Sequence, residues 1–119
     1  MTQSISLLDL VIKGIQDVKG ENISILDLRE TDSSVSDYFV ICTGRSSTNA
    51  KSIADSVSKE TELGLDDSPW HVEGKNNAEW ILMDYSELVV HIFTEESRDF
   101  YALEDLWADA KIERIKELV

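Results

Sequence analysis

Cysteine and histidine are scarce in this chain of 119 residues: there is one cysteine, Cys42, and there are two histidines, His71 and His91. A single thiol cannot form an internal disulfide, so we expect a reducing compartment, the cytoplasm. Neither histidine has a cysteine or a second histidine at the spacing of a zinc site, which normally takes four such ligands. The sequence therefore predicts no metal site.

Long apolar runs and linker-like segments are also missing. No apolar run approaches the ~20 residues that a membrane helix requires, and the first residues lack the basic and then apolar segments of a secretory signal. The only proline is Pro69, and no repeat or Gly/Ser-rich linker divides the chain. With 42% hydrophobic and 29% charged residues, the composition predicts one globular domain without membrane contact.

Basic residues are few: 11 Lys and Arg stand against 24 Asp and Glu, which gives a formal net charge of −13. The imbalance lies mainly in the second half, because residues 60–119 hold 16 acidic and 5 basic side chains. Such a surface is repelled by phosphate backbones, which argues against nucleic acid as the main contact. It favours a basic partner protein, since opposite fields speed encounter. Acidity that merely keeps the protein soluble is the alternative interpretation.

Hydrophobic periodicity predicts the element order αββαβββα. The expected helices cover residues 6–19, residues 46–63 and the segment from Thr94 onward, and the expected strands cover residues 23–28, 38–43, 70–73, 80–85 and 88–93. Ser4 or Ser6 is the expected cap of the first helix. Phe100, Leu103 and Trp107 are expected on one face of the last helix, and residues 109–119 are also expected to be helical. The pattern indicates an α/β or α+β fold, with a mixed sheet of about five strands flanked by helices.

The segments on either side of Ser86-Glu87 predict a hairpin with a two-residue turn. In that register Trp80 pairs with Phe93, and side chains alternate between the two faces of the hairpin. One face is nearly all apolar and belongs against helices: Ile81, Met83, Tyr85, Leu88, Val90 and Ile92. The other face mixes aromatic, acidic and imidazole groups: Trp80, Leu82, Asp84, Val89, His91 and Phe93. This mixture suits a protein interface, and a second core with Asp84 at its rim is the alternative.

Catalytic patterns are weak. Cys42 lies inside an apolar segment, where a thiol behaves as a small hydrophobic group, and no Gly-x-Ser-x-Gly elbow is present. Asp84 stands alone on its strand, so the paired acids of a two-metal nucleotidyl-transfer site are missing. Residues 43–47 (TGRSS) connect a strand to a helix, where free amides attract anions. We interpret this segment as a strand exit and helix cap, with nucleotide binding as the alternative, and expect no catalytic residue and no cofactor.

Several segments together resemble the Iojap family, the bacterial ribosomal silencing factors. The matching segments are residues 36–46 (SDYFVICTGRS), 53–55 (IAD), 72–74 (VEG), 80–85 (WILMDY), 89–93 (VVHIF), Arg98 and residues 100–110 (FYALEDLWADA). Each segment is short, and the specific feature is their ordered series with this spacing. The resemblance defines a domain over residues 1–110, followed by a C-terminal helical extension over residues 111–119.

The resemblance implies a small nucleotidyltransferase-like α/β fold without catalysis, so the chain is not expected to be an enzyme. Family members bind ribosomal protein fourteen of the large ribosomal subunit, on the face that meets the small subunit. Occupying that face blocks subunit joining and represses translation when nutrients are short. Organelle relatives act in assembly of the large subunit, which is the alternative function, and free members are often dimers.

By the same resemblance, six residues are expected to contact the partner: Trp80, Asp84, Tyr85, Glu73, His91 and Arg98. Trp80 would supply buried aromatic area, and Asp84 would pair with a basic residue of the partner. Tyr85 lies on the apolar face in the predicted register, but its position beside the turn lets its hydroxyl reach outward. Arg98 has a structural alternative, in which it bridges the last helix to a carboxylate of the sheet.

Overall fold

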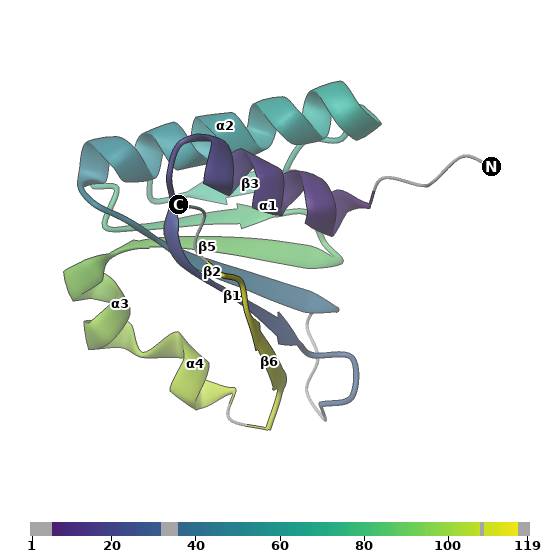
Figure 1. Cartoon of the computed structure of the whole chain (residues 1–119), viewed down its shortest axis with the longest axis vertical. Coiled ribbons are helices and arrows are strands. Elements are labelled where there is room, and N and C mark those ends of the chain that lie inside the picture. Colours follow the sequence, from purple (N-terminus) through teal and green to yellow (C-terminus); the bar gives the residue numbers. More distant parts are fainter. Residues whose placement is uncertain (1–5, 32–35, 108, 117–119) are drawn as a thin grey trace.

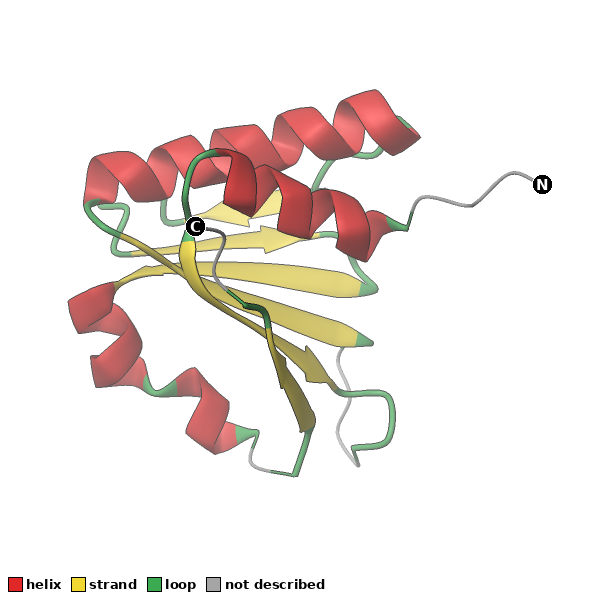
Figure 2. Cartoon of the chain, in the orientation of Figure 1, coloured by secondary structure: helices red, strands yellow, loops and turns green. Residues whose placement is uncertain are grey.

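The computed structural model describes residues 6–31, 36–107 and 109–116, which form one mixed sheet with helices on both faces (Figures 1 and 2). The helices are α1 (Leu7–Asp17), α2 (Ser47–Leu65), α3 (Glu95–Tyr101) and α4 (Leu103–Leu106). The strands are β1 (Glu21–Asp27), β2 (Tyr38–Gly44), β3 (His71–Glu73), β4 (Trp80–Asp84), β5 (Leu88–Thr94) and β6 (Lys111–Arg114). The predicted α/β class with a mixed sheet is confirmed.

Serine hydroxyls begin the two long helices. The Ser6 hydroxyl accepts a hydrogen bond from the Asp9 backbone N–H at 3.1 Å, and the Ser46 hydroxyl accepts one from the Asn49 backbone N–H at 3.0 Å. Ser4, the other candidate cap of α1, lies outside the described residues. In the described part of the chain, no helix combines the length and the apolar character needed to cross a membrane.

The sheet has the strand order β3-β4-β5-β2-β1-β6. The neighbours β2 and β5 are parallel, and the other adjacent pairs run antiparallel. Both central strands are apolar runs that are buried along almost their whole length, as the sequence of a strand covered on two faces requires. The β4–β5 hairpin has the predicted register, with Trp80 opposite Phe93 and Asp84 opposite Val89.

Helices α1 and α2 lie side by side over one face of the sheet (Figure 1). The core beneath them joins both helices to the predicted apolar face of the hairpin, and it includes Val11, Ile15, Ile53, Val57, Ile81, Met83, Val90 and Ile92. The helices approach closely at Gly14, where an added Cβ would lie 2.7 Å from the Cα of Val57. A side chain at position 14 would therefore push the two helices apart.

Helices α3 and α4 cover only part of the opposite face. Leu103 of α4 packs into a second apolar cluster formed by Leu26, Leu28, Phe39, Ile41, Val89 and Phe93. Trp80 and Leu82 of β4 lie at the margin of this cluster and remain half-buried, and all three residues of β3 are exposed. The outer strands β3 and β4 therefore keep an uncovered face on the side of α3.

The C-terminal part of the chain differs from the prediction. The expected single helix breaks at Ala102, whose left-handed backbone (φ 45°) separates α3 from α4. Phe100 therefore does not share a buried face with Leu103: Phe100 is 82% exposed, whereas Leu103 is buried.

The expected C-terminal helix over residues 109–119 is also wrong where it is described. Residues 111–114 form β6, which pairs with β1 in the register that places Ile112 opposite Leu26. The observed order is thus αββαβββααβ, and the sheet has six strands rather than about five. Backbone hydrogen bonds to the edge of β1 outweigh the weak helical spacing of this segment. Residues 117–119 of the expected helix lie outside the described residues.

Candidate functional site

The candidate site is the uncovered side of β3 and β4 together with the end of α3, which we call the open face. It consists of Trp70, His71, Glu73, Trp80, Leu82, Asp84, Phe100 and Tyr101. His71 lies opposite Asp84 in the register and Glu73 opposite Leu82, so these four side chains share one side of the sheet. Helix α3 continues this surface, because the ring centroids of Trp80 and Tyr101 are 4.7 Å apart.

Large aromatic rings on the open face are accessible to solvent. Trp70 is 67% exposed, Phe100 82% and Tyr101 47%. The Phe100 and Tyr101 rings also contact each other edge to face, with centroids 5.0 Å apart. Clustered exposed aromatic rings are typical of protein interfaces, where they supply most of the binding energy.

Trp80 joins the open face to the second apolar cluster. Its ring stacks on Phe93 with centroids 5.0 Å apart and contacts Tyr101 on the α3 side. Its indole N–H donates a hydrogen bond to Nδ1 of His91 at 3.1 Å. The predicted contact residue Trp80 is therefore half-buried and held from several directions, with part of its ring facing solvent.

Asp84 holds the other end of β4. Its Oδ1 accepts hydrogen bonds from the Trp70 indole N–H at 3.1 Å and from the Ser86 backbone N–H at 2.8 Å. These bonds fix both Trp70 and the turn of the hairpin. Asp84 is half-buried at the rim, as the alternative of a second core required, and its carboxylate charge remains on the open face.

The open face is acidic. Glu73 and Asp84 lie on it, and the exposed carboxylates of Glu79 and Asp99 come from the residues beside Trp80 and Phe100. The segments of β3, β4 and α3 contain one lysine or arginine, Arg98, and its guanidinium is engaged within the chain. His71 lies 2.9 Å from Glu73, so these two side chains form an ion pair when the imidazole is protonated.

Tyr85 and His91, two of the predicted contacts, lie in the interior. Tyr85 is 7% exposed, and its hydroxyl is 3.0 Å from the Thr61 hydroxyl of α2, so the expectation that it reaches outward is wrong. Burial raises the pKa of the Tyr85 hydroxyl above its ordinary value. His91 is 3% exposed, and burial lowers its pKa to about 4 despite the opposing charge of Asp84. Partner contact by these two residues stays a prediction.

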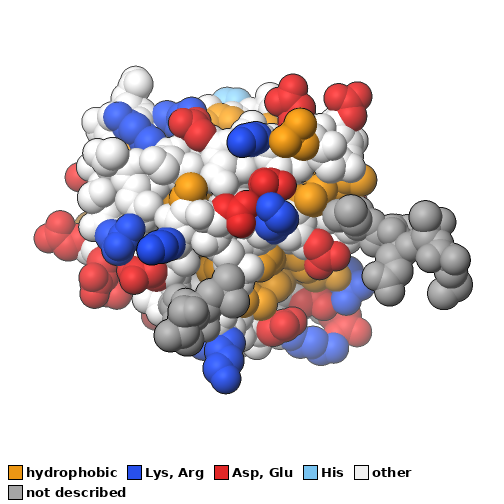
Figure 3. Space-filling model, turned by 45° about the horizontal axis from the view of Figure 1, so that its top comes forward, with side chains coloured by type: hydrophobic (Ala, Val, Ile, Leu, Met, Phe, Trp, Pro, Cys, Tyr) orange, Lys and Arg blue, Asp and Glu red, His pale blue; other side chains and the backbone are white. Residues whose placement is uncertain are grey.

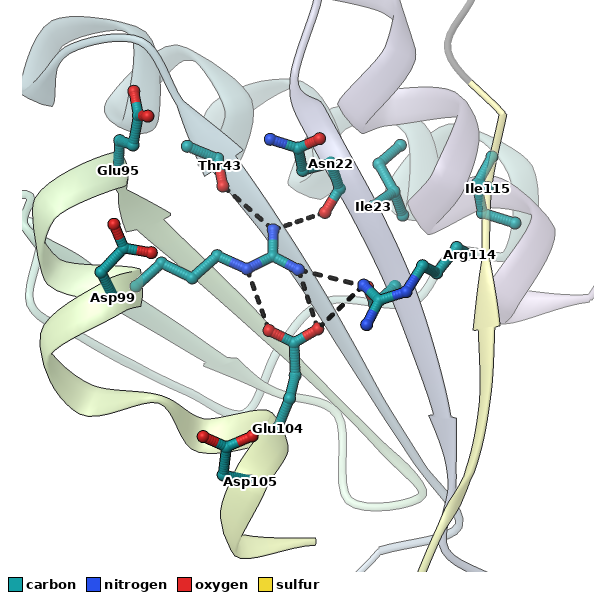
Figure 4. A pocket seen from close by; sticks show the side chains of 11 residues that line it. Asn22, Ile23, Thr43, Glu95, Asp99, Glu104, Asp105, Arg114 and Ile115 are labelled. Atoms are coloured by element: carbon teal, nitrogen blue, oxygen red, sulfur yellow. Dashed lines mark hydrogen bonds and ion pairs between the residues drawn. The ribbon is translucent and has the colours of Figure 1, made fainter. Parts of the chain in front are cut away.

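Arg98 links α3 to the sheet and to α4. Its guanidinium pairs with the Glu104 carboxylate at 3.0 Å and donates to the Thr43 hydroxyl and the Asn22 carbonyl (Figure 4). Burial alone would raise the pKa of Glu104, but the hydrogen bond and charge of Arg98 outweigh it and hold the pKa below its ordinary value. Arg98 thus has the structural role that the sequence left open, although the carboxylate that it meets belongs to α4 and not to the sheet.

A pocket of about 400 Å³ surrounds this network between α3, β1 and the chain after β6. Its lining carries the carboxylates of Glu95, Asp99 and Asp105 besides Glu104, and Arg114 lies 3.4 Å from Glu104. Figure 4 shows Glu104 pointing toward Arg114 and the Thr43–Asn22 side of the pocket. Glu104 is paired with both Arg98 and Arg114, so this network joins α3, α4 and β6.

The strand exit at residues 44–47 has the geometry of a helix cap. The Arg45 backbone N–H donates to the Asn49 side-chain carbonyl at 3.0 Å, so this amide is engaged within the chain. Cys42 is fully buried, and burial raises the pKa of its thiol to about 12. Over residues 6–31, 36–107 and 109–116, no three His, Cys, Asp or Glu side chains gather as a metal site.

The opposite side of the molecule has a different surface. Figure 3 shows the α1–α2 side, where acidic and basic side chains alternate with small apolar patches. Several of these charges are paired: Lys13 contacts Asp17 and Glu60 at 2.9 and 3.0 Å, and Lys75 contacts Asp55 at 2.7 Å. The concentration of aromatic rings with unbalanced acidity is thus a property of the open face.

The sequence left Trp70 open as either a core residue or an interface anchor, and it did not indicate two other aromatic residues of the site, Phe100 and Tyr101. One signal was present for α3: Phe100 and Tyr101 are consecutive, and consecutive residues of a helix point roughly 100° apart. Two adjacent large rings therefore cannot both lie centrally on one buried face. For Trp70, no local pattern indicates that its indole would meet Asp84.

The fold and the open face define a small mixed α/β domain that presents aromatic and acidic groups on an uncovered sheet face, an arrangement typical of protein-binding domains. The family model "Ribosomal silencing factor during starvation" matches residues 1–118. The chain belongs to this family, which confirms the resemblance found in the sequence.

Individual relatives agree with this assignment. The chain is 36% identical over 108 residues to the Ribosomal silencing factor RsfS of Bacillus subtilis, covering 90% of this chain and 89% of the relative. A crystal structure of a protein from Chromobacterium violaceum matches with a TM-score of 0.82 at 30% identity, covering 90% of this chain and 88% of that chain. A mouse relative, "Mitochondrial assembly of ribosomal large subunit protein 1", is 26% identical over 102 residues, covering 84% of this chain and 44% of the relative.

Proposed function

We propose that this chain binds the large ribosomal subunit through ribosomal protein fourteen and sterically blocks joining of the small subunit when nutrients are short. The observation that carries the proposal is the open face, which keeps aromatic rings in solvent beside unbalanced carboxylates. Membership of a family of ribosomal silencing factors supports the ribosome as the target.

The chemistry of the open face suits a basic protein. Trp70, Phe100 and Tyr101 offer exposed rings as anchors, and Trp80 offers the exposed part of its ring. The carboxylate of Asp84 lies beside the Trp70 indole and would pair with a lysine or arginine of the partner. Opposite charges speed encounter, and an interface of ~800 Å² per partner is sufficient for stable binding.

To block subunit joining, the chain only has to occupy the joining surface of the large subunit, and no catalytic turnover is required. We propose that the chain acts in the cytoplasm without catalysis and without a cofactor, because excluded volume on the joining surface is enough to keep the subunits apart. A dimer of free chains is part of this proposal, since exposed rings are better buried against a second copy until the ribosomal protein displaces it.

Assembly of the large subunit is a second candidate function. The mouse relative named for that process supports it, and it would use the same contact at an earlier time. Cells that lack the chain distinguish the two functions. Accumulation of incomplete large subunits during growth favours assembly, whereas normal subunits with excess joined ribosomes during starvation favour silencing.

Sedimentation of the tagged chain with purified ribosomal subunits through a sucrose gradient tests the proposal. We expect co-migration with the large subunit alone, and fewer joined ribosomes when the chain is added before the small subunit. Co-migration with the small subunit, or unchanged joining at saturating chain, would contradict it.

Two matched variants locate the contact. Asp84→Asn keeps an oxygen that accepts from Trp70 and Ser86 but removes the charge, so we expect weaker co-migration that is less sensitive to salt. Glu62→Gln removes an exposed carboxylate from α2 on the opposite layer, with the same change in net charge, and we expect no change in co-migration. Equal behaviour of the two variants would mean that net charge, and not the open face, determines binding.

A further inference from the structure

His91 is a buried polar residue in the middle of an apolar strand. It lies on β5 between Ile41 of β2 and Leu82 of β4 in the register, and it is 3% exposed. Its Nδ1 accepts the indole N–H of Trp80 at 3.1 Å. A neutral imidazole that accepts at Nδ1 carries its proton on Nε2, and this buried Nε2 has no hydrogen-bond partner among the described residues.

An unpartnered buried N–H destabilises the fold, so an aliphatic residue would fill this position at less cost. The neighbours of His91 offer ring contacts instead: Phe39 meets it edge to face with centroids 4.6 Å apart, and Phe93 stacks at 6.4 Å. The contact that distinguishes the imidazole from a hydrophobic side chain is therefore its acceptor toward Trp80. If a histidine at position 91 has a function, that function is to accept the hydrogen bond from Trp80.

The indole of Trp80 has one hydrogen-bond donor, and this donor points to His91. Stacking on Phe93 and contact with Tyr101 fix the plane of the Trp80 ring. They still allow the ring to rotate and slide within that plane. A hydrogen bond from the indole N–H fixes which edge of the ring faces inward. The opposite edge is then the one presented toward solvent on the open face.

We propose that His91 is a positioning residue that holds the Trp80 indole in the orientation used to bind the partner. The inference rests on the proposed function, in which Trp80 contacts ribosomal protein fourteen. His91 acts through Trp80 and needs no contact with the partner, which reconciles its burial with its place in the matched motif. The low pKa that burial gives His91 keeps the imidazole neutral and able to accept near neutral pH.

Two substitutions separate the acceptor from the shape of the ring. His91→Asn retains an oxygen close to the position of Nδ1, whereas His91→Leu removes the acceptor and fills the site with apolar atoms. In the free protein, we expect the Trp80 indole N–H resonance to shift and to exchange with water roughly tenfold faster in His91→Leu. We expect His91→Asn to restore slow exchange, and the Trp70 indole, which is bound to Asp84, to serve as an unchanged internal control.

Affinity for ribosomal protein fourteen provides the second readout. We expect His91→Leu to bind roughly three- to tenfold more weakly, with recovery in His91→Asn, and no further loss when His91→Leu is added to Trp80→Ala. An unchanged indole resonance in His91→Leu would overturn the positioning role. So would an equal loss of affinity in the presence and absence of Trp80.

The outcomes distinguish this inference from the proposed function. If Trp80→Ala binds as tightly as the native chain, the proposed contact fails, and the indole exchange rates of the free protein still decide whether His91 orients the ring. If His91→Leu does not fold, nitrogen NMR of the native imidazole decides instead. A protonated Nε2 with hydrogen-bond coupling between Nδ1 and the Trp80 indole supports the proposal, and a protonated Nδ1 overturns it.

Discussion

Replacing Trp80 by alanine removes the side chain that joins the open face to the interior. The variant loses three ring contacts, with Phe93, Tyr101 and His91, and one hydrogen bond, to His91. At about 0.5–1.5 kcal/mol for each ring contact and about 1 kcal/mol for the hydrogen bond, the free energy of unfolding falls by about 2.5 to 5.5 kcal/mol. A domain whose free energy of unfolding lies near the middle of the usual range, roughly 10 kcal/mol, remains folded after that loss.

Trp80→Ala also weakens binding to the partner. An aromatic anchor at the centre of an interface contributes about 2 kcal/mol or more, which corresponds to roughly a 30-fold rise in Kd. Calorimetric titration with ribosomal protein fourteen measures the Kd, and circular dichroism checks the fold. Leu63→Ala is the control, because Leu63 is a 73% exposed apolar residue on α2, away from the open face. An unchanged Kd, or a collapsed circular-dichroism spectrum, would refute the reasoning.

Three further predictions concern stability. Arg98→Leu removes the closer cation of Glu104 and leaves it only the more distant and exposed Arg114, so we expect thermal unfolding about 8 °C lower, with recovery when Glu104→Gln is added; no change would contradict the structural role of Arg98. His91 has a pKa lowered from 6.5 to about 4, so the unfolded state binds more protons between these values and stability is lost as pH falls from 6.5 toward 4. Urea unfolding should show about 2 kcal/mol more loss between pH 7 and pH 4.5 in the native chain than in His91→Asn, and parallel pH profiles would contradict this. Gly14→Ala places a Cβ 2.7 Å from the Val57 Cα, and we expect a loss of about 1–3 kcal/mol in the same assay, whereas a gain would show that the helices can separate.

The hairpin was predictable because its information is local. A two-residue turn at Ser86-Glu87 fixes every pair from Trp80–Phe93 to Asp84–Val89, and side-chain alternation then assigns both faces. The apolar face lies under α1 and α2 as predicted. On the mixed face the structure shows the second core that the sequence left open as an alternative, with Phe93 inside it and Asp84 at its rim, and the interface stays a prediction.

The C-terminal elements were not predictable for a physical reason. Residues 111–114 are all exposed and contain one apolar residue, Ile112, so they have no periodicity to distinguish an edge strand from a helix. Ala102 adopts a left-handed backbone that its side chain does not favour. The sequence therefore does not indicate that α3 ends there or that Phe100 is exposed. The inward hydroxyl of Tyr85 depends on Thr61, a neighbour that only the tertiary fold supplies.

Amide hydrogen exchange of the chain, measured alone and in complex with the large ribosomal subunit, tests the central claim most directly. If the open face binds the ribosome, amide hydrogen exchange in the complex slows in β3, β4 and α3 and stays the same on the outer surfaces of α1 and α2. Slower exchange confined to α1 and α2, or to the β6 edge, would contradict the account.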